Sequence, residues 1–168
     1  WKNLLSAVEV AEVNAIEVPL NEQDGQWSLD LDAVFDAVTD KTRAILVVSP
    51  SNPTGWTITP DEIKALLEFS RKTGVWIIAD EVYNRLTLFE DHAPSFLEYA
   101  HDRELLFTVN SFSKAYAMTG WRLGWLVGPP CAEEIICDIA LYNTMGAPTP
   151  LQYGGIAALR HGEDFIKE

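Results

Sequence analysis

The sequence has 168 residues, 48% of them hydrophobic, which is enough for one domain with a sizeable core. Its formal net charge of -13 argues against nucleic acid or an anionic membrane surface as the main partner, because both require basic patches. No apolar run approaches the roughly 18 residues of a membrane span, and the start of the chain shows no signal-peptide pattern.

The chain opens at Trp1 rather than at a methionine and stops at Glu168 within a helix-like stretch, so we expect it to be a piece of a longer protein. Cys131 and Cys137 are its only cysteines, and their spacing fits neither a redox pair nor a zinc site. They are typical of reduced thiols, which favours a cytoplasmic protein. The three histidines are scattered without metal-ligand spacing, so no metal site is expected.

Four apolar runs predict strands: residues 15–20, 44–49, 75–80 and 105–110. The last three are nearly continuous in β-branched, aromatic and other apolar residues, as is typical of strands covered on both faces. They begin about thirty residues apart, which is the length of a βαβ unit. The sequence therefore predicts a parallel sheet.

Helix signals fill the intervening segments. Ser28 is a candidate cap for a helix that runs on to about Val38. Thr59, Pro60 and Glu62 form a capping box with proline at the first helical position, and Gly74 closes this second helix before the next strand. The acidic residues at its start are explained by capping and the helix dipole rather than by catalysis.

After Asn110 the pattern changes. Only a dozen residues precede the short run 123–127, too few for a helical crossover, so this run is expected to pair antiparallel. Helices are predicted at about 132–143 and 151–160. The fold class is therefore α/β, a three-layer α/β/α arrangement with a mostly parallel sheet and no visible domain boundary.

Polar side chains gather where the predicted strands end, which is where open parallel sheets bind ligands. Three successive strand ends deliver seven such residues to one rim: Asn52, Asp80, Tyr83, Ser111, Ser113, Lys114 and Arg122.

Two features of this rim suggest its chemistry. Asp80 ends a run that should be buried, and a buried carboxylate either needs a cationic or multiply donating partner or caps a nearby helix. The chain is acidic, yet Lys114 and Arg122 place two cations within a span of nine residues, beside two serine hydroxyls. This mixture suits a phosphate. A lysine exposed on a loop is the plainer interpretation of Lys114.

Three motifs in order carry a specific resemblance: Asn52-Pro-Thr-Gly55, Asp80-Glu-Val-Tyr83, and Ser111-Phe-Ser-Lys114 followed by Gly120-Trp-Arg-Leu-Gly124. They resemble those of fold-type I pyridoxal-phosphate (PLP) enzymes, in particular the class I/II aminotransferases of the aspartate and aromatic branch. The resemblance covers nearly the whole chain. It implies the aspartate aminotransferase-like large domain and a PLP cofactor.

The resemblance implies that Lys114 binds the cofactor as a Schiff base and later shuttles a proton. Asp80 would pair with the pyridine nitrogen and keep it protonated, so that the ring accepts electrons. Glu81 should point to the opposite side of the strand and has no assigned role.

The remaining positions would hold the rest of the cofactor. Asn52 and Tyr83 would hydrogen-bond its phenolic oxygen and tune its ionisation. Ser111 and Arg122 would hold the phosphate, with Ser113 as a further contact. The implied catalytic residues are thus Lys114, Asp80 and Tyr83, and the implied partners are amino-acid and 2-oxo-acid substrates and a second subunit in a homodimer.

Members of this family are typically more than twice as long, so residues 1–168 are expected to form the central part of the PLP-binding large domain, without the N-terminal segment and the C-terminal small domain. The activity of this piece alone is an open question.

The first interpretation is an aminotransferase. Another fold-type I chemistry, such as a C–S lyase or a cyclopropane-forming synthase, uses the same anchors. A PLP-binding sensor domain of a transcription regulator is a third interpretation, and an accidental match of the motifs is a fourth.

Overall fold

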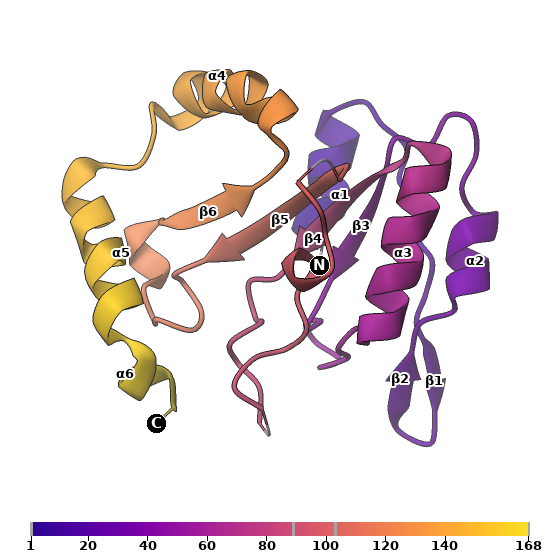
Figure 1. Cartoon of the computed structure of the whole chain (residues 1–168), viewed down its shortest axis with the longest axis horizontal. Coiled ribbons are helices and arrows are strands. Elements are labelled where there is room, and N and C mark those ends of the chain that lie inside the picture. The colour runs from indigo at the N-terminus through magenta and orange to yellow at the C-terminus, as the bar shows by residue number, and fades with distance from the viewer. Residues whose placement is uncertain (1, 89, 103, 168) are drawn as a thin grey trace.

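A four-stranded sheet forms the centre of the computed structural model, which describes residues 2–88, 90–102 and 104–167 (Figure 1). Its strand order is β3-β4-β5-β6. β3 (Ala44–Val48), β4 (Trp76–Asp80) and β5 (Leu106–Ser111) run parallel, and β6 (Gly124–Val127) pairs antiparallel with β5. The three parallel strands and the antiparallel partner predicted from the sequence are therefore confirmed.

The helix between β3 and β4 begins and ends where local signals predicted. α3 (Pro60–Thr73) is capped by Thr59, whose hydroxyl accepts the Glu62 N–H at 3.3 Å, while the Glu62 carboxylate accepts the Thr59 N–H at 2.7 Å. Gly74 ends it in the left-handed conformation, φ 76°, and donates its N–H to the Ser70 carbonyl. These caps fix where the chain enters β4, and so where β4 ends at Asp80.

The main core lies between α3 and one face of the sheet. Ile63, Leu66 and Leu67 of α3 are almost fully buried and belong to one apolar cluster with Ile77 of β4 and Leu106 of β5. Each such side chain contributes about 1.5–3 kcal/mol when it leaves water. In Figure 1, α3 lies in front of the sheet and α1 (Lys2–Val10) behind it, which gives the predicted α/β/α layering.

Two expectations for the N-terminal part are wrong. Residues 15–20 form no strand; they run largely exposed to β1 (Asn21–Gln23) and β2 (Gln26–Ser28), which pair as a small hairpin. A strand needs a neighbour for its main-chain groups, and no neighbouring strand is found for this run among the described residues. Ser28 ends β2, and Asp30 instead caps α2 (Leu31–Asp36) by accepting the Ala33 N–H at 3.0 Å.

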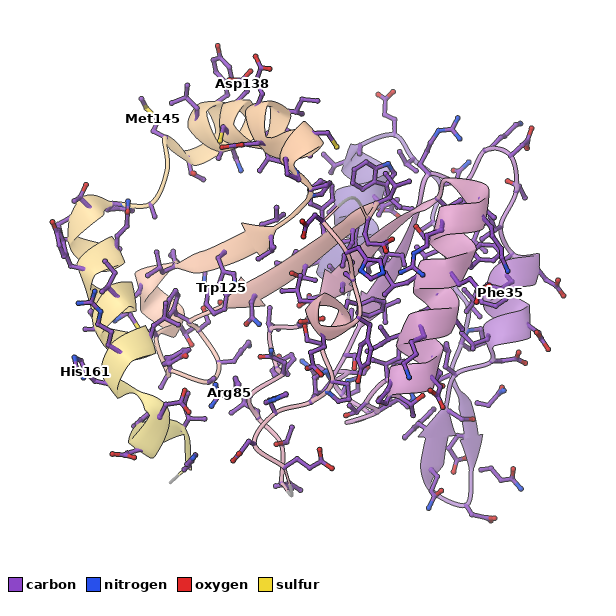
Figure 2. All side chains as sticks on the ribbon, viewed as in Figure 1. Phe35, Arg85, Trp125, Asp138, Met145 and His161 are labelled. Carbon is purple, nitrogen blue, oxygen red and sulfur yellow. The ribbon has the colours of Figure 1, made fainter. Side chains whose placement is uncertain are left out.

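The C-terminal helices follow β6. The 3₁₀ turn Pro130–Ala132 leads into α4 (Glu133–Thr144), and α5 (Thr149–His161) and α6 (Glu163–Lys167) end the chain, so both predicted helices are confirmed. α4 buries none of its side chains, and Figure 2 shows Asp138 and Met145 directed away from the sheet. α5 packs through Ala158 on the second apolar cluster, Phe112, Met118 and Leu123. Among the described residues, no helix has both the length and the apolar character needed to cross a bilayer.

Candidate active site

The predicted site residues lie at the carboxyl ends of three adjacent strands. The register pairs Val48 with Asp80 and Asp80 with Val109, so β3, β4 and β5 end at neighbouring positions of one sheet edge. The loops that leave these strands carry the polar motifs. The fold therefore brings the polar residues of all three motifs to one edge of the sheet.

Asn52, Tyr83 and Lys114 come together from three different loops. The Asn52 side-chain amide donates to the Tyr83 hydroxyl oxygen at 3.2 Å. The Lys114 Nζ lies 5.1 Å from the centre of the Tyr83 ring, within the range of a cation–π contact. Because Asn52 supplies the hydrogen in its bond, the Tyr83 hydroxyl keeps its own hydrogen for another acceptor. A phenol donor, an amide and a primary amine thus converge on one point.

Asp80 lies beside this group and is partly buried. Its Oδ1 accepts the N–H of Val82 at 3.2 Å, within its own turn rather than at a helix start. Burial raises the pKa of the Asp80 carboxyl above its ordinary value, although the Val82 N–H and the positive charge of Lys114 oppose this. The carboxylate is therefore short of donors, as expected for a group that pairs with a cation.

Ser111, Ser113 and Arg122 belong to one hydrogen-bonded turn. The Ser111 hydroxyl accepts the Ser113 N–H at 3.1 Å. The Ser113 carbonyl accepts the Thr119 hydroxyl at 3.0 Å, and the Thr119 carbonyl accepts the Arg122 guanidinium at 3.1 Å. Arg122 ends the 3₁₀ turn Thr119–Trp121 with a left-handed backbone, φ 52°, which is uncommon outside glycine.

Glu81 points away from this rim, as strand alternation predicted. The residue is 3% exposed, and its carboxylate accepts the Ser95 hydroxyl at 2.7 Å and the Phe96 N–H at 2.8 Å. These bonds hold the 3₁₀ turn Phe96–Glu98 against the sheet. Glu81 is thus a structural group on the opposite side from Asp80.

Two groups of the site carry no clear signal in the sequence. Thr119 links Ser113 to Arg122, and its place just before the Gly120-Trp-Arg motif is the one feature that points to it. Asn110 donates to the side chain of Asn84, and so connects the loop of Tyr83 with that of Ser111. A single asparagine at a strand end carries no pattern from which that contact could be predicted.

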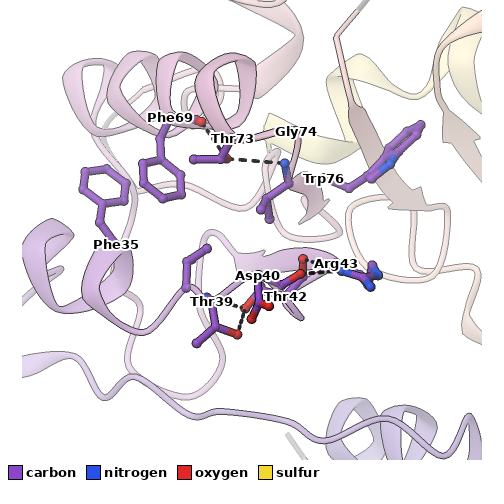
Figure 3. Close-up of a pocket in the computed structure, with 11 residues that line it drawn as sticks. Phe35, Thr39, Asp40, Thr42, Arg43, Phe69, Thr73, Gly74 and Trp76 are labelled. Carbon is purple, nitrogen blue, oxygen red and sulfur yellow. Dashed lines mark hydrogen bonds between the residues drawn. The ribbon is translucent and has the colours of Figure 1, made fainter.

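A hollow of about 650 Å³ lies at the other end of the sheet (Figure 3). It lies between α2 and α3, where Phe35 and Phe69 stack with ring centres 4.3 Å apart. Arg43 in its wall already donates to the carbonyls of Asp40 and Thr42. None of the predicted site residues lines it, and within the described residues no cluster of metal-ligating side chains occurs.

Comparison with known proteins gives one consistent family. The family model described as aminotransferase class I and II matches residues 1–168. The chain is 35% identical over 156 residues to a probable aspartate/prephenate aminotransferase of Aquifex aeolicus (strain VF5), covering 91% of this chain and 39% of that protein. It is 37% identical over 169 residues to the aspartate aminotransferase of Geobacillus stearothermophilus, covering 100% of this chain and 43% of that protein.

Solved structures agree with this result. N-succinyldiaminopimelate aminotransferase from Mycobacterium tuberculosis superimposes with a TM-score of 0.90 at 29% identity, over 99% of this chain and 43% of that one. The aromatic aminotransferase from Pyrococcus horikoshii OT3 gives a TM-score of 0.80 at 34% identity, over 91% of this chain and 42% of that one. The chain thus spans about two fifths of the length of the relatives that it matches.

Proposed function

Since this chain belongs to the aminotransferase class I and II family, we propose that it carries the cofactor-anchoring part of a PLP-dependent aminotransferase. The whole enzyme would transfer an amino group between an amino acid and a 2-oxo acid. The observation that carries the proposal is the convergence of Lys114, Tyr83 and Asn52 beside the carboxylate of Asp80. When bound, PLP supplies an electron-accepting ring that stabilises negative charge on the substrate carbon.

The donors and acceptors of the rim fit this cofactor. Asp80 would pair with the protonated ring nitrogen, which gives a partly buried carboxylate a cationic partner in direct contact. Tyr83 would donate its free hydroxyl hydrogen to the phenolic oxygen, and Asn52 fixes the direction of that hydroxyl through its 3.2 Å bond. Both residues favour the ionised oxygen, since hydrogen bonds to a charged form stabilise it.

The serine turn would hold the phosphate. Ser111 and Ser113 offer hydroxyls two residues apart on one turn, and Arg122 adds a guanidinium that is held by the Thr119 carbonyl at 3.1 Å. Such a planar cation is suited to bidentate contact with phosphate oxygens. The covalent and electrostatic anchors therefore lie on a single turn of about a dozen residues.

Lys114 would both attach the cofactor and move a proton. Its side chain is exposed and its amine lies over the face of the Tyr83 ring, so it has room to leave and return. Once displaced by substrate, its Nζ would take a proton from one carbon and deliver it to another. The Asp80 carboxylate lowers the cost of a positive charge at Nζ when the amine carries that proton.

The rest of the enzyme enters as a wider proposal. Residues 1–168 would correspond to the central part of the large domain, and the amino-acid and 2-oxo-acid substrates would be selected elsewhere in the whole protein. A homodimer and a cytoplasmic location complete the proposal. Free, exposed cysteines at positions 131 and 137 support a reducing compartment.

The test is an absorption titration of the purified chain with PLP. We expect a visible band of the protein-bound cofactor in the parent and in Lys41→Ala, which removes an exposed lysine at the other end of the sheet. The band should disappear in Lys114→Ala and in Lys114→Arg, because arginine keeps the charge but cannot form the same bond. A band that survives in Lys114→Ala would refute the assigned anchor, and a folded parent without any band would refute the proposal that these residues carry the cofactor-anchoring part.

A further inference from the structure

One side chain, that of Asn110, joins the two loops that carry the proposed cofactor anchors. We propose that Asn110 is a positioning residue that sets the spacing between the Asp80–Tyr83 loop and the Ser111–Lys114 turn. This inference rests on the proposed function, because the spacing matters only if one ligand spans both loops. Asn110 itself is not expected to touch the cofactor.

The contacts of Asn110 run in both directions. Its Nδ2 donates to the Oδ1 of Asn84 at 3.2 Å, and its Oδ1 accepts the N–H of Ser111 at 2.8 Å. Asn84 directly follows Tyr83 in the chain, and Ser111 is the first residue of the phosphate turn. The side-chain amide of Asn110 therefore connects Asn84, which adjoins Tyr83, to Ser111.

Both ends of this connection are themselves held. Asn84 donates its N–H to the Glu81 carbonyl at 3.0 Å, and its carbonyl accepts the Ala93 N–H at 2.8 Å. The Ser111 hydroxyl accepts the Ser113 N–H at 3.1 Å. Asn110 is partly buried, so water competes poorly for its amide. The bridge consequently links two ordered turns rather than two free ends.

The hydrogen-bond pattern fixes the orientation of both amides. The Oδ1 of Asn110 must face Ser111, because a main-chain N–H can only donate. Its Nδ2 is therefore turned to Asn84, which must present its oxygen. One hydrogen bond joins the two side chains, so at least one of them must be an amide that can donate.

This requirement defines a set of four proteins. Asn84→Asp retains an acceptor for the Asn110 amide. In Asn110→Asp the carboxylate still accepts the Ser111 N–H, and the Asn84 amide can turn over to donate to it. The double variant N84D/N110D leaves two carboxylates facing each other with no donor between them. The singles thus act as matched controls for added negative charge.

The measurements are PLP affinity, by absorption titration, and amide hydrogen exchange of Ser111 in the cofactor-free chain. We expect each single variant to bind PLP within about threefold of the parent, and the double variant to bind about tenfold more weakly than the product of the singles predicts. Exchange at Ser111 should accelerate in the double variant alone. Affinities that multiply without excess loss, together with unchanged exchange, would overturn the inference.

Two further outcomes remain decisive. If the parent binds no PLP, the proposed function fails, and unchanged Ser111 exchange in the double variant would show that Asn110 does not hold the turn either. If the double variant does not fold, Asn110→Ala and Asn84→Ala replace it. We then expect both to weaken PLP binding about fivefold, the cost of one ordinary hydrogen bond, and both to speed exchange at Ser111, Asn110→Ala more strongly because it also removes the acceptor of the Ser111 N–H. Exchange at Ser111 that stays at the parent rate in Asn84→Ala would count against the bridge.

Discussion

Gly124 should be far less tolerant of alanine than Gly120, although both belong to the same short motif. A Cβ on Gly124 would lie 2.6 Å from the main-chain oxygen of Asn110, about 0.8 Å inside the 3.4 Å at which ordinary contact begins. The clashing atom belongs to β5, so relief requires β6 to move away from its partner strand. A Cβ on Gly120 meets nothing within 4 Å.

The expected magnitude follows from this geometry. Forcing an extra carbon into a packed position costs about 1–3 kcal/mol. For a chain of this size, one kcal/mol shifts the melting temperature by about 2–4 °C, so Gly124→Ala should lower Tm by roughly 2–12 °C. Gly120→Ala should leave Tm unchanged or raise it slightly, because alanine reduces the freedom of the unfolded chain.

Thermal unfolding followed by circular dichroism separates the two cases. The two variants also bear on the site, since Gly124 pairs with Ser111 across the two strands. A displaced β6 would shift the Ser111–Lys114 turn, and PLP affinity should fall in Gly124→Ala but not in Gly120→Ala. Equal melting temperatures for the two variants would refute the reasoning from close approach.

Three other changes test the fold and its charges. Thr59→Ala removes the hydroxyl that caps α3 and should lower the free energy of unfolding by about 1 kcal/mol, measured by urea denaturation. Ile77→Ala, at a fully buried position, should cost about 2–5 kcal/mol in the same assay, whereas Leu126→Ala, 43% exposed, should cost much less. Burial raises the pKa of Glu81 above 4.5, so its contribution to stability is complete below about pH 4.5 and is lost as pH rises through the raised pKa. Glu81→Gln should therefore reduce the fall in stability between about pH 4 and pH 8, and a fall as large as that of the parent would contradict this assignment.

Much of the fold could be predicted because its signals are local. The apolar runs of β3, β4 and β5 mark buried strands, and the capping box at Thr59 together with Gly74 marks both ends of α3. The strand predicted at residues 15–20 is wrong because its formation depends on non-local contacts. Its composition favours a strand, but a strand exists only where another lies beside it, and that is decided by distant parts of the chain.

The candidate site likewise has one part that could be predicted from the sequence and another that could not. That Asn52, Tyr83 and Lys114 should converge could be inferred, because parallel strands deliver their ends to one edge. The left-handed backbone of Arg122 and the bond between Asn84 and Asn110 could not. Both depend on the path of loops after the strands end, and asparagine or arginine at those positions is compatible with many paths.

The close approach at Gly124 and the bridge of Asn110 act on the same residue from two directions. The Asn110 carbonyl lies against Gly124, which only a residue without a Cβ permits, while the Asn110 side chain holds the Ser111 N–H at 2.8 Å. Ser111 is therefore fixed both across the sheet and toward the Tyr83 loop. Lys114, by contrast, is exposed, with its amine against a ring face. A hydrogen-bonded serine and an exposed lysine would suit the proposed site, in which the phosphate stays in place while the amine leaves and returns.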